Sequence, residues 1–417
     1  MRYSFLTISL LIASLAFSQK VTYVDHIKPI IDQHCMPCHE TGNIGPIPLT
    51  DYEEVSSYGS MIGYVTTNRI MPPWKADHRY SLIEGANVLT PDKIKTIKKW
   101  VDGGLEEGVD TIQNPYADTV KIIESDTSII TFAMSESFRH KGDYNALWQV
   151  FVIPSNLNED LYVDEIEFIP GSPSIVKSCA ISIDTSHLPF KYDKTDPKYG
   201  YNNLGGLAFI PHSYLWYYWT PDQKKKILPN PYIKKIPKGS TIVMHIQYAP
   251  SGEAKSDSSI LRLHKTQKHA HTRIIHSQLL ADAEMLLRDE KFINPHDKRS
   301  CQTTVAMERD ITIHGLTPLG QYVNKSWKIY GKTIDGAIIP MLKIEDWELQ
   351  WKRSYELIHP VTLNKGDEII IEAYYDNTEE NINIPQYPPR KTYPGEGRRD
   401  EMFMVQYDYS VPLNVKS

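Results

Sequence analysis

The chain has 417 residues, which is too long for a single hydrophobic core, so we expect two or three domains. Its hydrophobic content of 41% and charged content of 23% are ordinary for a globular protein. The formal net charge is -6 and there is no basic run, which argues against nucleic acid or an anionic membrane surface as a partner.

The first eighteen residues have the pattern of a secretory signal peptide. Arg2 precedes a mostly apolar run over residues 5–17, and Ala16-Phe17-Ser18 has the small residues typical of a cleavage site. The run is shorter than the roughly 20 apolar residues that a spanning helix needs, and no later segment is long and apolar enough. We therefore expect a mature protein that starts at Gln19, is periplasmic or secreted, and has no membrane span.

The most informative stretch is Cys35-Met36-Pro37-Cys38-His39. Two thiols three positions apart can form thioethers with the vinyl groups of a haem, while the next histidine ligates the iron from the same turn. Zinc would need two further Cys or His ligands, and the sequence has no second CxxC and no HxxxH. We therefore expect covalent haem c, attached to Cys35 and Cys38, with His39 as an axial ligand.

The two remaining cysteines are Cys179 and Cys301. They are either a disulfide, which an exported protein permits, or two separate buried thiols. A disulfide requires their Cα atoms to approach within about 7 Å, and the sequence leaves both alternatives open.

Residues 19–112 are expected to form an all-α cytochrome c domain. Before the haem motif, helical spacing is shown by Val24, Ile27, Ile30 and Ile31. A second helix is expected to start after the N-cap Thr90, with Pro91 in its first position, and to end at Gly103-Gly104. Its apolar stripe comprises Ile94, Ile97, Trp100 and Val101. Glycines and prolines over residues 42–48 predict a loop against the haem.

Met71 is the expected second axial ligand of the iron. It lies in the proline-bounded segment Ile70-Met71-Pro72-Pro73-Trp74, and a thioether ligand would raise the reduction potential and favour electron transfer. This segment, followed by the helix after Thr90, is similar to small bacterial cytochrome c domains whose methionine in that motif binds iron. The alternatives are core packing of Met71, or ligation by His26, His34, His78 or Met61.

After a polar linker, the sequence changes to short β-like runs rich in Val, Ile and Tyr. The clearest lie at residues 148–153, 162–168, 174–183, 240–248, 259–263, 368–375 and 402–407. We expect a multidomain protein in which the all-α cytochrome c domain is followed by two all-β sandwich domains. The expected boundaries are 1–18 for the signal peptide, 19–112, 113–144 for a linker and lead-in strand, 145–270 and 271–417.

Several motifs in the β region carry a family resemblance. In the first half they are Phe168-Ile169-Pro170-Gly171-Ser172, Ile236-Pro237-Lys238-Gly239-Ser240 and Tyr248-Ala249-Pro250-Ser251-Gly252. In the second half they are Lys325-Ser326-Trp327-Lys328, Asp335-Gly336, Trp347-Glu348-Leu349-Gln350-Trp351, Tyr375-Asp376-Asn377-Thr378 with Asn381, and Asp400-Glu401-Met402. Their order and spacing resemble the copper type II, ascorbate-dependent monooxygenases, the family of peptidylglycine hydroxylating monooxygenase, and the whole chain resembles a bacterial fusion of a small cytochrome c to that module.

The resemblance implies two copper sites, but this chain departs from the family at five of six ligand positions. The positions that resemble the family's ligands are Lys177, Ser178, Gln247, Leu319, Gln321 and Met402, and only the methionine matches. A lone thioether is too weak a ligand to retain copper, and a protonated Lys177 would repel the ion. Copper is therefore not expected. A rebuilt site would have to use His269 and His271 or the scattered His212, His245, His264, His276 and His314.

Three functions remain in view, and no catalytic residue is assigned. The favoured one is an exported electron-transfer protein with haem c, whose monooxygenase-like β module has lost copper and binds a redox partner protein, or a small ligand or peptide between the β domains. The alternative is a working copper monooxygenase with relocated ligands, fed electrons by the haem. The third is a binding scaffold in which the haem is a sensor or a minor peroxidase. The aromatic run Tyr214–Trp219 is expected to be core, or else to line a groove between the domains.

Overall fold

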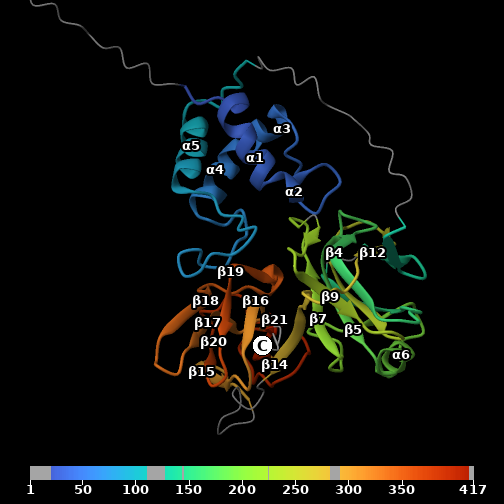
Figure 1. The fold of residues 1–417 in the computed structure, drawn as a ribbon. Helices are drawn as coiled ribbons and strands as arrows, with labels where there is room; N and C mark the ends of the chain where they lie inside the picture. The colour runs from blue at the N-terminus through green and yellow to red at the C-terminus, as the bar shows by residue number, and fades with distance from the viewer. Residues whose placement is uncertain (1–19, 110–126, 143–144, 224, 282–291, 413–417) are drawn as a thin grey trace, which may run out of the picture.

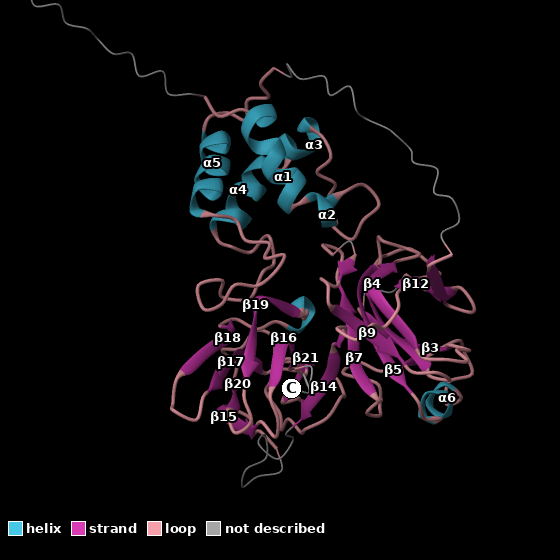
Figure 2. Cartoon of the chain, in the orientation of Figure 1, coloured by secondary structure: helices cyan, strands magenta, loops and turns pink. Residues whose placement is uncertain are grey.

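The computed structural model describes residues 20–109, 127–142, 145–223, 225–281 and 292–412. The expected signal peptide lies outside the described residues, as does half of the expected linker and lead-in strand at residues 113–144. Most regular structure is β: strands account for 39% of the chain and helices for 14%. Two β-sandwiches lie side by side, and a group of short helices lies across their upper end in the view of Figures 1 and 2.

The first sandwich is built from a six-stranded and a five-stranded sheet. The six-stranded sheet has the order β1 (Ile129–Ala133), β12 (Ile260–Lys265), β4 (Leu161–Ile169), β9 (Tyr232–Ile236) and β13 (Arg273–Ile274), with β8 (Lys226–Ile227) also paired to β4. The five-stranded sheet has the order β6 (Tyr201–Asn202), β3 (Leu147–Pro154), β10 (Thr241–Tyr248), β5 (Val176–Asp184) and β7 (Ser213–Trp219). A small ribbon pairs β2 (Phe138–His140) with β11 (Lys255–Asp257), and α6 (Leu188–Asp193) follows β5.

The second sandwich has two four-stranded sheets. One has the order β14 (His276–Ala281), β21 (Met404–Ser410), β16 (Ile311–Leu319) and β19 (Tyr355–Leu363). The other has the order β15 (Asp297–Ala306), β20 (Glu368–Asn377), β17 (Asn324–Lys332) and β18 (Ile338–Ile344). The short 3-10 helix η2 (Leu349–Trp351) lies between β18 and β19.

Each sandwich buries its own apolar core because alternate side chains of its strands point between the sheets. Phe151, Phe168 and Trp219 belong to the first core, and Trp327 and Tyr375 belong to the second. A third apolar cluster joins the sandwiches, with Tyr214, Leu215 and Tyr218 of β7 packing near Leu319 and Met402. The aromatic run of β7 is therefore buried and shared between the first core and the contact between the sandwiches.

The helical region contains η1 (Tyr23–Ile27), α1 (Lys28–His34), α2 (Met36–His39), α3 (Tyr52–Ser57), α4 (Gly59–Thr67) and α5 (Pro91–Asp102). The predicted start of α5 is confirmed, since Thr90 Oγ1 accepts a hydrogen bond from the backbone N–H of Lys93 at 3.3 Å. Ile97 and Trp100 point into an apolar cluster with Ile27 and Ile31.

The prediction of a separate all-α cytochrome c domain before two β-sandwich domains is wrong. Helix is a minor part of a mostly β chain, and the helices are short. The long connection between α4 and α5 leaves the helices and joins the second sandwich, with the bridges Ala76 to Ile344 and Ile83 to Leu357. Ala76 and Ile83 are buried in the core of that sandwich. A segment inside residues 19–112 is thus part of the β architecture, so this stretch is not an independent helical domain.

The two other cysteines lie in different cores. Cys179 of β5 is buried in the first sandwich and Cys301 of β15 in the second, and both are free thiols. The disulfide alternative is therefore wrong. Among the described residues, no helix has both the length and the apolar character needed to cross a membrane.

Candidate functional site

The Cys35 to His39 motif occupies a single helical turn. The backbone N–H of Cys35 still bonds to Ile31 at the end of α1, and the N–H groups of Cys38 and His39 both bond to the carbonyl of Cys35, at 3.1 and 3.0 Å. Both thiols are partly buried, and Cys35 packs against the apolar cluster of the helical region. The turn therefore brings two thiols and an imidazole together without help from distant parts of the chain.

The imidazole of His39 is oriented by the loop that follows it. Its Nδ1 lies 2.7 Å from the carbonyl oxygen of Ile47, so Nδ1–H donates this bond and Nε2 keeps its lone pair. The loop approaches closely because Gly45 has no side chain: a Cβ there would lie 2.7 Å from His39 Nδ1 and 2.6 Å from the carbonyl of Cys38. A backbone carbonyl on the distal nitrogen is the arrangement that orients metal-bound histidines in proteins.

These residues fit a covalently attached haem better than zinc. Burial raises the pKa of the Cys35 thiol to about 12 and that of Cys38 to about 11, so both are neutral thiols rather than thiolates at neutral pH. In the part of the chain that the structure describes, no group of three or more His, Cys, Asp and Glu residues is placed to hold a metal ion. The donor set is thus two thiols suited to thioether formation and one imidazole nitrogen suited to iron.

Met71 follows α4, and its backbone N–H bonds to the carbonyl of Val65 at 3.2 Å. Its side chain is half-buried, and within the described residues it is not a member of the apolar clusters of the helices or of the second sandwich. Core packing therefore does not account for it, and its role as an iron ligand stays a prediction.

The competing ligands are less suited to iron. Both ring nitrogens of His34 are engaged, by Asn87 Oδ1 at 2.6 Å and by Lys93 Nζ at 2.7 Å. The Nδ1 atom of His26 accepts a hydrogen bond from the backbone N–H of Thr22 at 3.2 Å. His78 and Met61 are exposed.

The haem motif faces charged residues of both sandwiches. The charges that act on the Cys38 thiol are those of Asp222, Arg353 and Lys177. Arg353 lies 2.9 Å from Asp222 in an ion pair between the sandwiches, and its guanidinium lies 4.5 Å from the ring centre of Trp74. In Figure 1, α2 lies at the end of the helical region that points towards the sheets. The β portion therefore supplies part of the surroundings of the motif.

A pocket of about 310 Å³ opens between the two sandwiches. Its lining from the first sandwich comprises Ala146, Trp148, Lys177, Gln247, Ala249 and Pro250. Its lining from the second sandwich comprises Gln321, Tyr322, Trp347, Glu348, Leu349, Gln350 and Asn383. Three of the six positions singled out from the sequence, Lys177, Gln247 and Gln321, thus converge on one cavity.

The other three positions lie around this pocket without lining it. Ser178 donates to Gln247 Oε1 and accepts from the hydroxyl of Tyr218, both at 3.1 Å. Leu319 and Met402 are buried in the apolar cluster that joins the sandwiches. Met402 is therefore packed in apolar surroundings.

Lys177 enters the pocket from β5. Its Nζ lies 4.5 Å from the ring centre of Trp351, and the described residues offer it no ion pair. Burial lowers the pKa of its ammonium to about 8, against the opposing influence of Glu348 and the Cys38 thiol. Glu348 is itself bound by Lys75 Nζ at 2.6 Å and by Gln350 Nε2 at 2.9 Å. Lys177 is thus a half-buried cation whose nearest carboxylate is already neutralised.

Gln321 is held rigidly on the opposite wall. Its backbone N–H donates to Glu401, its carbonyl accepts from the indole of Trp347 at 3.1 Å, and its Nε2 donates to the carbonyl of Gly395 at 2.9 Å. The residue is fully buried, yet its Oε1 has no hydrogen-bond partner. A buried hydrogen-bond acceptor without a donor lowers the stability of the fold unless a ligand or a water molecule donates to it.

Among the residues that the structure describes, no histidine lines the pocket. His269 and His271 lie exposed in the turn before β13, rather than on a strand. His245 is buried, with its Nε2 at 2.7 Å from the carbonyl of Asn203, and burial lowers its pKa to about 3. His264 bonds to Asp164, and His314 bonds to Ser410. The rings of His245, His264 and His314 are thus bonded in separate places, and among the described residues no group of three or more His, Cys, Asp and Glu is placed to hold a metal ion.

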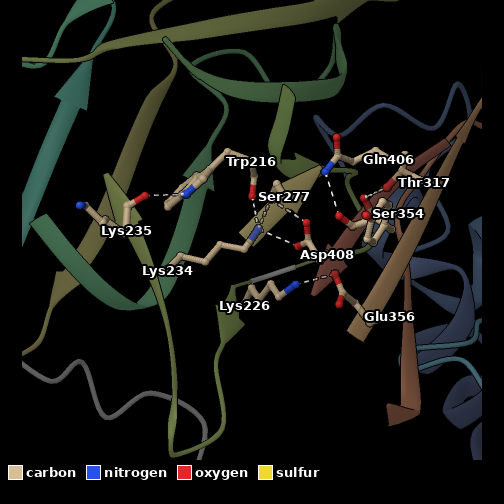
Figure 3. Close-up of polar contacts among 11 residues, drawn as sticks. Trp216, Lys226, Lys234, Lys235, Ser277, Thr317, Ser354, Glu356, Gln406 and Asp408 are labelled. Carbon is tan, nitrogen blue, oxygen red and sulfur yellow. Dashed lines mark hydrogen bonds and ion pairs between the residues drawn. The ribbon is translucent and has the colours of Figure 1, made fainter. Parts of the chain in front are cut away.

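A second polar contact between the sandwiches was not foreseen from the sequence. Lys234 of β9 is 1% exposed, and its Nζ donates to the carbonyl of Trp216, to Ser277 Oγ at 3.1 Å and to Asp408 Oδ2 at 2.7 Å (Figure 3). Lys226 pairs with Glu356 nearby. The one available signal was a lysine inside the apolar strand pattern of residues 232–236, and its partners are too distant in sequence to be inferred.

Comparison with known proteins does not support the family resemblance. No family model matches the chain, and no curated protein matches it. Among solved structures, that of PNGF-II is similar over 68% of this chain and 65% of its own length, with 11% identity and a TM-score of 0.28. The structure of infectious bursal disease virus Gx strain is similar over 68% of this chain and 71% of its own, with 8% identity and a TM-score of 0.19. TM-scores this low carry no argument about function.

The resemblance to a cytochrome c fused to a copper monooxygenase module is therefore wrong as a family assignment. The structure is mostly β, with a few short helices and no separate all-α domain among the described residues. Short motifs around turns and tryptophans recur in many sandwiches, which is why their order and spacing misled.

Proposed function

We propose that this protein is an exported electron-transfer protein that carries haem c on Cys35 and Cys38, and whose β portion serves for binding. The observation that carries the proposal is the oriented imidazole: the His39 Nδ1–H bond to the Ile47 carbonyl leaves Nε2 available beside two thiols on the same turn. When bound, the haem supplies one-electron exchange between ferrous and ferric iron.

The residues of this chain have distinct roles in the proposal. Cys35 and Cys38 would hold the haem through thioethers, which form by addition of each S–H across a vinyl group, so that no leaving group or oxidant is needed. His39 and Met71 would ligate its iron. Lys177 and the pair of Arg353 with Asp222 set the charge near the Cys38 end of the haem. A charged, partly buried environment of this kind tunes a reduction potential.

The β portion is proposed to bind a redox partner protein or a small ligand. The pocket between the sandwiches supports this role, because it is lined by Lys177, whose charge also acts on the Cys38 thiol. Binding there would occur close to the redox centre.

The test is expression in a host that attaches haem c in the periplasm. The expected product keeps its haem after denaturation and shows a mass increase of one haem, and it takes up and releases one electron reversibly. Cys35→Ser with Cys38→Ser should remove all covalent haem, whereas Cys179→Ser should leave it in place. Wild-type protein without covalent haem under these conditions would refute the proposal.

The role of Met71 is tested separately. In Met71→Ala, the reduction potential should fall and carbon monoxide should bind the ferrous form readily, while Met61→Ala should behave as wild type. If the wild type already binds carbon monoxide readily, the sixth position is open and the sensor or peroxidase function is favoured.

A further inference from the structure

The pocket between the sandwiches has the size and composition of a small-molecule site. Its volume of about 310 Å³ is at the lower end of the range of about 300–1,000 Å³ typical of such sites. Trp148, Trp347 and Tyr322 contribute flat aromatic surface, while Ala249 and Pro250 are small and apolar. Such walls fit a compact, flat organic body.

Two polar groups in this pocket lack a protein partner. Lys177 has no hydrogen bond or ion pair within the described residues and lies over the ring of Trp351, and the neighbouring Glu348 is paired with Lys75. Gln321 lines the pocket but is 0% exposed, and its Oε1 has no protein partner, so a ligand donor reaches this oxygen only when the lining side chains move apart. Its other polar groups are bonded to Glu401, Trp347 and Gly395. The Gln321 amide therefore cannot turn to satisfy Oε1 without breaking the bond from Nε2 to Gly395.

The Lys177 ammonium and the Gln321 Oε1 would each bind a different kind of ligand group. An ammonium in a partly dry pocket requires an anion, and a carboxylate can accept its hydrogen bonds. A carbonyl oxygen requires a donor, such as an N–H or O–H on the body of the ligand. The distribution over both sandwiches means that a ligand would touch the two walls at once.

We propose that this pocket binds a small organic acid with a flat aromatic body, whose carboxylate pairs with Lys177 and whose N–H or O–H donates to Gln321 Oε1. This deepens the binding role in the proposed function and rests on it, but it does not require the haem. Gln247 also lines the pocket, but its Oε1 already accepts a hydrogen bond from Ser178. Lys177 is therefore the cationic lining residue that would select an acid over a neutral ligand.

The test is isothermal titration calorimetry on the full chain with four probes. Indole-3-acetate supplies the acid, the flat body and the donor. Indole-3-acetamide is the neutral counterpart, 1-methylindole-3-acetate lacks the donor, and inorganic phosphate is an anion without the body. We expect saturable binding of indole-3-acetate, at least tenfold weaker binding of the amide and of the methylated acid, and no binding of phosphate.

Two variants assign the contacts. Lys177→Met should abolish the preference for the acid over the amide, and Gln321→Met should abolish the preference for indole-3-acetate over its methylated form. Lys194→Met, at an exposed position after α6, is the control and should bind like the wild type. Circular dichroism and thermal melting establish that each variant is folded.

The outcomes separate this inference from the proposed function. Equal affinity for acid and amide, competition by phosphate at equal affinity, or unchanged selectivity in Lys177→Met would overturn it. Because calorimetry does not depend on haem, binding without covalent haem would sustain the inference and refute the proposed function. Covalent haem without acid binding would do the reverse.

Discussion

Lys234 and Lys177 of the first sandwich both reach towards the second, and they differ in what they contact. Lys234 is buried and donates to a carbonyl, a hydroxyl and a carboxylate, so its three N–H groups are all used (Figure 3). Lys177 meets an aromatic ring and a cavity. The first arrangement is complete within the protein and fixes the sandwiches against each other, whereas the second is completed only by a ligand.

The comparison shows how a structural charge differs from a binding charge in one interface. Burial lowers the pKa of both lysines, so burial alone does not distinguish them. The difference lies in the partners: Asp408 sits 2.7 Å from Lys234, while the carboxylate nearest to Lys177 is held by Lys75.

The largest expected effect comes from removing the carboxylate partner of Lys234. Asp408→Ala leaves a buried ammonium without its counter-ion and should lower the free energy of unfolding by about 3–5 kcal/mol. The double variant Lys234→Met with Asp408→Leu should recover most of this loss, because it removes both charges. Urea denaturation followed by tryptophan fluorescence measures both. A loss below about 1 kcal/mol in the single variant would show that Lys234 does not depend on Asp408.

The next effect concerns Glu401, which holds the wall that carries Gln321. Its two oxygens accept four backbone N–H bonds, from Gln321, Val323, Asn324 and Met402. Glu401→Gln replaces one oxygen by a donor, so two N–H groups lose their acceptor, and we expect a loss of about 2–4 kcal/mol. The affinity for indole-3-acetate should fall as well. Glu53→Gln, exposed on α3, should change neither quantity, and unchanged binding in Glu401→Gln would mean that Gln321 is positioned by other contacts.

A smaller effect is the pH dependence of acid binding. Burial lowers the pKa of Lys177 to about 8, with Glu348 and the Cys38 thiol as the neighbouring titratable groups. Since the charged form binds the acid, affinity should be constant below about pH 7, reach about half its maximum near pH 8 and fall by roughly tenfold or more by pH 9.5. Titrations across this range measure it, and Lys177→Met should give a flat profile. A profile for the wild type that is flat to pH 9.5 would exclude Lys177 as the anion-binding group.

The contribution of Lys177 to folding stability changes with pH in the opposite direction to its contribution to acid binding. Because the folded pKa of Lys177 lies below its unfolded value of 10.5, the unfolded chain holds more protons between pH 8 and 10.5, and this residue's contribution to stability rises with pH there. At neutral pH the burial of its charge opposes folding.

The smallest expected effect is therefore that of Lys177→Met on stability. The variant removes a partly desolvated charge without an ion-pair partner and keeps most of the side-chain volume, so the free energy of unfolding should change by no more than about 1 kcal/mol, and in the stabilising direction. Urea denaturation at pH 7 checks this. A loss like that of Asp408→Ala would make Lys177 a structural residue and remove the contrast with Lys234.

Local features of the fold could be predicted from the sequence. The strand expected over residues 240–248 is observed as β10 (Thr241–Tyr248), and the helix expected after Thr90 is observed as α5. Both depend on side-chain alternation or capping within a few residues. The β-sandwich character of the later chain followed from the same kind of pattern.

The architecture of the N-terminal region could not be predicted in this way. The connection between α4 and α5 has no helical or strand periodicity, so nothing local indicated that Ala76 and Ile83 belong to the core of the second sandwich. In the absence of a local signal, the tertiary structure of this region was inferred from the resemblance of short motifs, and that inference gave the wrong family. Similarly, the positions Lys177, Gln247 and Gln321 were singled out as lost copper ligands, and the structure instead joins them around a cavity.

By itself, the sequence determined the chemistry of the turn from Cys35 to His39, the cap of α5 and the alternation of the strands, because each of these depends on neighbours along the chain. Only the tertiary structure decided that Lys234 is completed by Asp408, 174 residues later, and that Lys177 faces an open cavity. Whether a buried lysine stabilises the fold or is available to a ligand depends on whether a carboxylate distant in sequence lies beside it. The packing of the two sandwiches determines this.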